Sequence, residues 1–220
     1  MIFGRPLKKV LGKIIPFGRI ETIHPQNLGT GVRDGSNFLR DDGVWSDIPY
    51  TSYGLYVQTA LGPIITNTTV QTSLIGAGVG TLTVPPNSFK VGDSFVAKMC
   101  GYLSCANNET IHIRVKSDGN IIVDAGVFEM KISTNKYFEL TLDFTVTKIG
   151  VAGVAELFTN GQYSYNNNSL GELLGNNFAL VTTTIFDTTV LNALSITAEW
   201  GLAKPENSIQ SQNFVLNKVY

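Results

Sequence analysis

Between residues 64 and 220, large apolar residues alternate with polar ones in short runs, as they do in strands with one buried and one solvent-facing side. The clearest run is Phe138–Thr147, in which every even position is large and apolar and every odd position is polar. Leu194–Trp200 and Ile111–Lys116 repeat the alternation, and the second of these places His112 on the polar side. These runs predict half-buried strands of an antiparallel sheet.

Shorter apolar segments between turn-forming residues predict further strands. We expect them at Thr69–Leu74, Thr81–Val84, Ser94–Leu103, Ile121–Phe128, Val151–Phe158, Val181–Phe186 and Phe214–Tyr220. Val151–Phe158 has a helix-forming composition, but its place directly after Ile149-Gly150 favours a strand that returns antiparallel to Phe138–Thr147. The residues Ser117-Asp118-Gly119-Asn120 predict a hairpin turn. The pattern as a whole predicts an all-β fold, an antiparallel β-sandwich with jelly-roll topology, preceded by an extended N-terminal arm.

Three segments differ in composition. Residues 21–63 are rich in Gly, Asp and Pro and predict an extended, turn-rich connector, whereas residues 64–220 carry the strand pattern of the sandwich. Residues 1–20 hold five basic residues and no acid, so this arm has a formal charge of +5 and the other 200 residues have −6. The basic residues of the arm are Arg5, Lys8, Lys9, Lys13 and Arg19.

The arm has the spacing of a short amphipathic helix. Pro6 suits its first turn and Pro16 its end, and one face would carry Leu7, Val10, Leu11 and Ile14. Two interpretations stay open, an anchor that docks on an acidic or apolar partner surface and a frayed, solvated terminus. The arm lacks the pattern of a secretory signal, and no apolar run approaches the ~20 residues of a membrane-spanning helix. We therefore expect synthesis in a cytosol and no membrane span.

Candidate chemistry is sparse. The chain has two cysteines, Cys100 and Cys105, and two histidines, without the second cysteine pair of a typical zinc site. The two cysteines could form a disulfide at a hairpin tip, but we expect two buried free thiols. Hydrolytic centres that use a histidine base are not expected, because the polar side of a strand makes His112 a solvated residue. We predict no catalytic residues, no cofactor and no metal. The acidic body also disfavours binding of nucleic acid.

Carboxylate pairs from distant strands leave glycoside hydrolysis open, with Glu139, Asp143 and Glu199 as candidates, although each falls on a polar strand face. Those polar faces are dominated by Thr, Asn and Ser, a composition that allows packing against copies of the same surface without charge repulsion. Exposed tyrosines on such a surface also suit sugar binding by ring stacking. On this basis Tyr163 and Tyr165 are candidate glycan contacts, while a plain sandwich exterior is the alternative.

The connector contains Gly35-Ser36-Asn37-Phe38-Leu39-Arg40-Asp41-Asp42-Gly43-Val44-Trp45. This segment resembles the G-x-x-F-L-R-x-D-G-x-W motif that precedes head domains in tail fibres and other structural proteins of phages and large DNA viruses. Asp41-Asp42-Gly43 predicts a tight turn. Phe38, Leu39 and Trp45 are large apolar residues on a segment too short to bury them, so we expect them to pack on a neighbouring domain or on another subunit.

The body is similar to jelly-roll proteins of virions, including trimeric heads of the tumour-necrosis-factor-like kind. The similarity is carried by Leu74–Gly78, Val91–Phe95, Ala198–Gly201 and Phe214–Leu216. With the motif it covers about residues 34–220, and it implies a homotrimer in which Phe38, Leu39 and Trp45 meet. The chain has no collagen-like repeats and no coiled-coil heptads, which favours a short vertex or minor capsid component over a projecting fibre.

These observations lead to one main hypothesis and one alternative. The main hypothesis is a non-enzymatic virion structural protein, made in the host cytoplasm, whose arm docks on other virion proteins and whose trimeric head contacts a host receptor or glycan. The alternative is a carbohydrate-binding β-sandwich module or a glycan-cleaving enzyme. A weaker possibility is an internal cement protein whose arm contacts membrane or genome.

Overall fold

The structure is a computed structural model that describes residues 37–39, 44–47, 53–169, 172–183 and 185–220. The basic arm and the predicted Asp41–Gly43 turn lie outside these residues. The chain divides into two compact units, residues 1–50 and residues 51–220. Each unit is described separately below.

The first unit contains a short antiparallel strand pair, β1 (Asn37–Leu39) and β2 (Trp45–Asp47). In its backbone register Leu39 lies opposite Trp45 and Phe38 lies opposite Ser46. The three residues expected to form subunit contacts, Phe38, Leu39 and Trp45, therefore all belong to this strand pair. Their role in trimer contacts remains a prediction.

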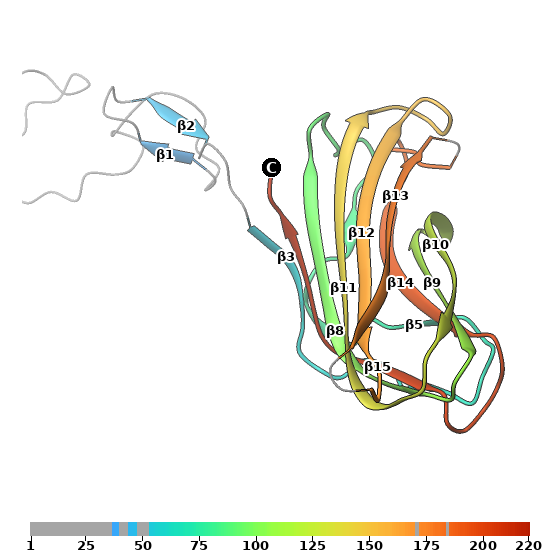
Figure 1. Ribbon diagram of the computed structural model, residues 1–220. Helices are drawn as coiled ribbons and strands as arrows, with labels where there is room; N and C mark the ends of the chain where they lie inside the picture. Colours follow the sequence, from blue (N-terminus) through green and yellow to red (C-terminus); the bar gives the residue numbers. More distant parts are fainter. Residues whose placement is uncertain (1–36, 40–43, 48–52, 170–171, 184) are drawn as a thin grey trace, which may run out of the picture. The chain divides into compact units, whose positions relative to one another are not determined.

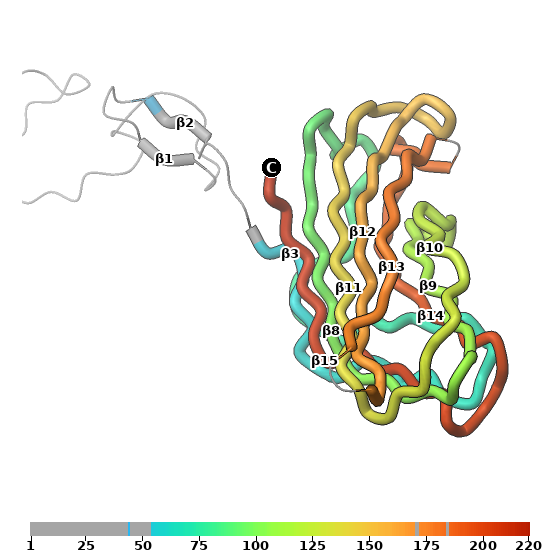
Figure 2. The backbone as a smooth tube through the Cα atoms, viewed as in Figure 1, coloured from blue at the N-terminus to red at the C-terminus, as the bar shows by residue number. Residues whose placement is uncertain are grey.

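The second unit consists of two antiparallel sheets packed face to face (Figure 1). The strands of the larger sheet are β3 (Tyr53–Gln58), β4 (Ile65–Thr66), β6 (Gly78–Gly80), β8 (Ser94–Cys105), β11 (Ser133–Lys148), β12 (Glu156–Asn166), β13 (Leu173–Thr182) and β15 (Ser208–Lys218). Their order is β13-β12-β11-β8-β15-β3-β6, and β4 pairs with one end of β15. Figure 2 shows β3 and β15 side by side, near the end at which the chain terminates.

The smaller sheet contains five strands. They are β5 (Thr72–Ser73), β7 (Thr83–Val84), β9 (Glu109–Ser117), β10 (Asn120–Met130) and β14 (Asn192–Trp200). Their order is β10-β9-β14-β5, and β7 pairs with the beginning of β14. The described residues include no helix long and apolar enough to cross a membrane.

The connections between the sheets confirm the predicted jelly roll. One sheet contains the order β3-β15-β8-β11 and the other the order β5-β14-β9-β10, so the chain passes back and forth between the sheets and its first and last long strands become neighbours. This is the double Greek key of an eight-stranded jelly roll. β12 and β13 extend the larger sheet beyond it as a simple meander.

The inward faces of the two sheets form one apolar core. β11 contributes Phe138, Leu140, Leu142, Phe144 and Val146, all buried, as the even-numbered phase predicts. Opposite this strand, β9 and β14 bury the apolar phase of their own alternation, which ends at the fully buried Trp200. The indole Nε1 of Trp200 donates a hydrogen bond of 3.1 Å to the carbonyl oxygen of Ile65, so this polar atom is satisfied inside the core.

The predicted hairpin between β9 and β10 is confirmed. Ser117 pairs with Asn120, and the two residues between them have left-handed φ values of 46° at Asp118 and 81° at Gly119. Two consecutive residues of positive φ characterise the type I′ turn, whose twist matches that of the paired strands. An Asp-Gly pair adopts this conformation at low cost, since Gly has no Cβ and Asp tolerates the left-handed region.

Several strand boundaries differ from those expected. Val151–Val154 is a turn, and the return strand begins only at Glu156, although it does run antiparallel to β11 as expected. A strand was expected at Val181–Phe186. The observed strand, β13, ends at Thr182 and therefore lies almost entirely before the expected range. β3 belongs to the larger sheet, so the connector predicted for residues 21–63 extends too far into the body.

The buried phase of β11 makes a stability prediction. Leu140 is buried, so Leu140→Ala should lower the free energy of unfolding by about 2–5 kcal/mol, through lost burial and the cavity left behind. Thr141, the next residue, faces outward, and Thr141→Ala should change it by less than about 1 kcal/mol. Urea denaturation of both variants measures the difference. Equal losses would contradict the assigned phase of the strand.

Candidate functional site

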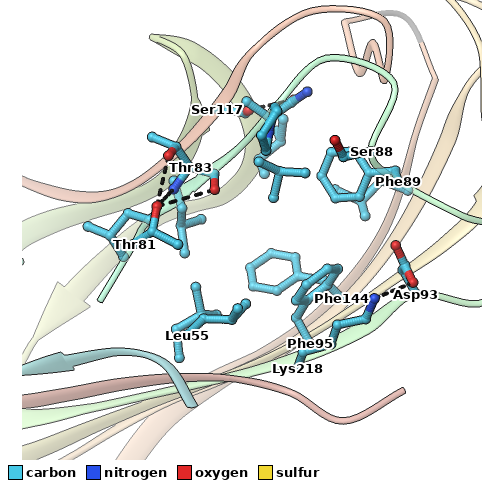
Figure 3. Close-up of a pocket in the computed structure, with 18 of the residues that line it drawn as sticks. Leu55, Thr81, Thr83, Ser88, Phe89, Asp93, Phe95, Ser117, Phe144 and Lys218 are labelled. Carbon is cyan, nitrogen blue, oxygen red and sulfur yellow. Dashed lines mark hydrogen bonds and ion pairs between the residues drawn. The ribbon is translucent and has the colours of Figure 1, made fainter. Parts of the chain in front are cut away.

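An apolar cavity of about 280 Å³ lies between the two sheets (Figure 3). It is at the end of the sandwich where the chain enters β3, because Lys218 lines it and pairs with Tyr53. Four aromatic rings contribute to its wall, those of Phe89, Phe95, Phe144 and Phe186. Phe89 packs edge-on against two of them, with ring centroids 6.1 Å from Phe95 and 5.6 Å from Phe186.

The charged groups and several of the hydroxyl and amide groups that line this cavity are already paired. Lys218 Nζ lies 2.6 Å from the buried carboxylate of Asp93, which also accepts a hydrogen bond of 2.9 Å from the backbone N–H of Lys90. Ser117 Oγ donates to Asn192 Oδ1 at 2.7 Å. Asp93 and Lys218 are the only ionisable side chains among the described residues that line the cavity, and they form this ion pair. The arrangement offers apolar volume and neither a free base nor an activated nucleophile.

The strongest cluster of ionisable side chains lies on the outer face of the smaller sheet. His112 and Arg114 of β9 are flanked by Asp124 of β10 and Glu199 of β14, with Arg114 Nη1 2.5 Å from Glu199 Oε2. His112 Nε2 contacts Asp124 Oδ1, and Arg114 Nη2 lies 2.6 Å from His112 Nδ1. The expectation of a solvated histidine is wrong, because these neighbours leave the His112 side chain 17% exposed.

This network fixes the tautomer of His112. A guanidinium group only donates hydrogen bonds, so Nδ1 of His112 must accept from Arg114, and Nε2 then carries the proton and donates to Asp124. Neither ring nitrogen is left to take a proton from a substrate. Burial raises the pKa of Asp124, but hydrogen bonds from His112 and from the backbone N–H of Gly126 outweigh it and lower the pKa overall. The cluster is a cross-strand ion network.

The candidate carboxylates for glycoside hydrolysis are not brought together. Glu139 and Asp143 lie on the outer face of β11, four residues apart, which corresponds to about 13 Å along a strand. Glycosidase carboxylates stand at most about 9.5 Å apart. Glu199 lies on the outer face of the other sheet, bound to Arg114. The three residues therefore form no catalytic pair.

The two cysteines are free thiols. Their spacing of five places their side chains on opposite faces of β8, with Cys105 in the core and Cys100 half-buried on the outer face. A disulfide between them would require one side chain to cross the sheet. Burial raises the pKa of the Cys105 thiol. Among the described residues, no group of three His, Cys, Asp or Glu side chains is placed to bind a metal ion.

The expectation that Tyr163 and Tyr165 are exposed is wrong. Only 1% of Tyr163 and 4% of Tyr165 is accessible, because odd-numbered positions of β12 face the core. Tyr163 stacks on Phe128 with ring centroids 5.4 Å apart, and its other ring contacts include Tyr165 at 6.0 Å. Stacking of a sugar needs an accessible ring face, which neither residue has.

Two different tyrosines are exposed on the outer face of the larger sheet. Tyr102 of β8 and Tyr137 of β11 lie directly opposite each other, with 41% and 42% of their surface accessible. The strand phases indicate this placement, since Met99, Gly101 and Leu103 point inward around Tyr102, and Tyr137 precedes the inward Phe138. Sequence reasoning overlooked these two residues, although the alternation it used was sufficient to find them.

An exposed apolar surface occupies the end of the sandwich near the cavity. We call it the end patch, and it consists of Ile149, Val151, Val154, Phe158, Val181, Ile185, Val190 and Leu191, each between 38% and 57% exposed. Two backbone hydrogen bonds join the loops that carry it, from Gly153 N to Thr183 O at 2.6 Å and from Thr188 N to Gly150 O at 2.9 Å. Phe158 and Val181 are direct cross-strand neighbours. The end patch thus includes residues of two hydrogen-bonded loops and of two paired strands.

The lowered pKa of Asp124 gives a pH prediction. Its ionised form stabilises the fold fully above the ordinary aspartate pKa of 3.8, and this contribution is lost as the pH falls through the lowered pKa. Asp124→Asn should therefore be less stable than wild type at pH 7, by at most about 1 kcal/mol at this half-exposed site, and the difference should shrink below about pH 4. Urea unfolding at both pH values measures it. Asp143→Asn is the control, and a difference for Asp124→Asn that is constant with pH would refute the network.

No protein-family model matches the chain, and no curated protein matches it. Among solved structures, the chain is similar to the CBM2 module of the evolved Dit of Lactobacillus casei BL23 phage J-1. That similarity has a TM-score of 0.34 and 11% sequence identity, and it covers 79% of this chain and 99% of the module. Because both the TM-score and the sequence identity are low, this similarity does not indicate a function for the chain.

Proposed function

We propose that this chain is a non-enzymatic structural protein of a virion, a short fibre or spike head or a minor capsid or vertex component that assembles as a homotrimer. The observation that carries the proposal is the end patch. An exposed group of eight large apolar side chains is typical of a protein–protein contact, because its burial in an interface removes apolar area from water. A second and third copy of this chain are the proposed partners.

The composition of the end patch supports assembly between identical copies. Its eight apolar side chains belong mainly to the loop after β11 and to the chain after β13. The charged residues beside the patch are already engaged within the chain, since Lys148 Nζ lies 2.8 Å from Glu156 Oε2 and the Asp187 carboxylate accepts hydrogen bonds from the N–H and the hydroxyl of Thr189. A copy of the same patch therefore meets an ion pair and a hydrogen-bonded carboxylate at its border, and not a carboxylate without partners. The jelly-roll topology and the resemblance of Gly35–Trp45 to a motif of virion proteins are consistent with this role.

The N-terminal arm is proposed as the attachment to other virion proteins. Its charge of +5 contrasts with −6 on the rest of the chain, so the arm is suited to an acidic partner surface and the body is not suited to a polyanion. In this role the protein is made in the host cytoplasm and resides in the virion. The trimer presents its remaining surface to the host receptor or glycan.

Charged substitutions in the end patch should dissociate the trimer. We expect light scattering to give three chain masses for wild type and one for the double variant Val154→Glu, Val181→Glu, because assembly would bury two carboxylates without partners. Val127→Glu is the matched control, since Val127 is also exposed but lies on the smaller sheet, and it should leave the trimer intact. A monomeric wild type, or a trimer that tolerates both glutamates, would refute this assembly.

Deletion of residues 1–20 separates attachment from assembly. The truncated chain should remain a folded trimer by light scattering and circular dichroism, because the described residues between Tyr56 and Leu216 already form one apolar core. It should no longer be incorporated into particles when it replaces the full chain during virion assembly. Charge reversal of Lys8, Lys9 and Lys13 to Glu within the full chain should have the same effect. Normal incorporation of either variant would rule out the anchor.

A further inference from the structure

Tyr102 and Tyr137 form an aromatic pair on the outer face of the larger sheet. Their ring centroids are 6.3 Å apart with an interplanar angle of 80°, so one ring stands edge-on to the other. The β8–β11 register holds them directly opposite each other, which limits their freedom and keeps ring surface exposed to solvent. Rings that are rigid and partly dehydrated in advance lose little entropy when a ligand covers them.

Polar side chains flank this pair on neighbouring strands. Gln210 of β15 lies directly opposite Tyr102, and its Nε2 donates a hydrogen bond of 2.9 Å to the carbonyl oxygen of Gly62. That bond orients the amide and leaves its Oε1 as an acceptor. On the other side, Glu139 of β11 is exposed opposite Ser164 of β12. The rings are thus bordered by an amide, a hydroxyl and a carboxylate, the groups that bind sugar hydroxyls.

A polar hollow lies on the same part of the sheet. It has a volume of about 390 Å³ and is lined in part by Gln162, Ser164, Gly175 and Asn177. Gly175 pairs with Ser164, and a Cβ at Gly175 would meet the carbonyl oxygen of Tyr163 at 2.0 Å, so this position excludes a side chain that would fill the hollow. β11 and β13 are two strands apart, about 10 Å, so the hollow is within reach of a ligand that covers Tyr137.

We propose that this surface binds a neutral oligosaccharide, with one sugar ring stacked on the face of one of the two tyrosines and in contact with the other, and a following sugar in the hollow at Gly175. Sugar rings present apolar C–H faces together with hydroxyl groups, which matches aromatic rings bordered by amides and hydroxyls. The inference deepens the proposed function, because it names the host molecule that the assembled protein contacts.

Charge selects among oligosaccharides. Glu139 is exposed beside the aromatic pair, and residues 21–220 have a formal charge of −6, so sialylated or sulfated glycans would be repelled. The Tyr137 hydroxyl adds no charge, since hydrogen bonding to the Cys100 side chain is the main cause that raises the pKa of Tyr137 to about 12. Its hydroxyl therefore stays protonated in neutral solution. The surface fits uncharged hexoses and N-acetylhexosamines.

Binding of the full chain to an array of immobilised oligosaccharides tests the inference. The array contains neutral oligosaccharides of glucose, galactose, mannose, rhamnose and N-acetylglucosamine, with sialylated and sulfated counterparts. Wild type should bind neutral members, and Tyr102→Ala and Tyr137→Ala should each weaken binding by about tenfold or more, as expected for loss of an aromatic anchor. Tyr102→Phe and Tyr137→Phe should retain most binding, because the ring remains.

Two controls separate this inference from the proposed assembly. Tyr220→Ala removes a tyrosine that is 60% exposed near the opposite end of the strands, and it should leave glycan binding unchanged. Light scattering and circular dichroism of the same samples report the trimer and the fold. Tyrosine-dependent binding by a monomer would support the glycan site and refute the trimer. A trimer that binds no neutral glycan, or that binds equally well as Tyr102→Ala and Tyr137→Ala, would overturn the glycan site.

Discussion

Burial of one face of each sheet against the other is the constraint on which the rest of this molecule depends. It assigns every strand residue to one of two sides, since successive side chains of a strand point in opposite directions. In β11 this burial takes Phe138, Leu140 and Leu142 into the core and leaves Tyr137 and Glu139 outside. Which side chains are available for partners follows directly from the phase of each strand.

The two ends of the sandwich differ in chemistry because different loops close them. The end where β3 begins and β15 terminates carries the apolar end patch and the aromatic cavity. Tyr102 and Tyr137 lie toward the other end of the long strands, eight residues from Ser94 in β8, or about 26 Å. The surfaces proposed for assembly and for glycan binding are thereby separated along the strands, so that the two proposed contacts do not exclude each other.

The sequence predicted β9, β11 and β14 because regular alternation over six or more residues leaves one possible phase. The jelly roll was predicted from the number of short strands and the lack of a long helix. The alternation failed for β12, where the inward phase includes Thr159 and Gly161, and these small or polar residues conceal the period. The ring of Phe178 covers Gly161, since a Cβ there would approach its Cζ to 2.2 Å. That tertiary contact, which no local pattern contains, explains why Tyr163 and Tyr165 were mistaken for surface residues. Strands of two or three residues are too short to show a period. β5 and β7 lie within the longer ranges expected at Thr69–Leu74 and Thr81–Val84, whereas β4 and β6 were not predicted.

The distribution of charge decides which outer face can be covered by a partner. On the smaller sheet, the outward positions of the described strands include His112, Arg114, Lys116, Asp124, Glu129 and Glu199. In that network both nitrogens of His112 and the guanidinium of Arg114 already have hydrogen-bond or ion-pair partners. A partner that covered the face would dehydrate these groups, and the free energy of its own contacts would have to outweigh the loss of hydration. The outer face of the larger sheet has Lys98, Glu139 and Asp143 among hydroxyl, amide and tyrosine side chains, with the Lys148–Glu156 ion pair at the ends of β11 and β12. Fewer charges lose water when this face is covered, and an uncharged ligand such as a neutral sugar leaves the remaining carboxylates hydrated at its border. Covering the larger sheet therefore dehydrates fewer charged groups than covering the smaller one, in agreement with the glycan surface proposed there.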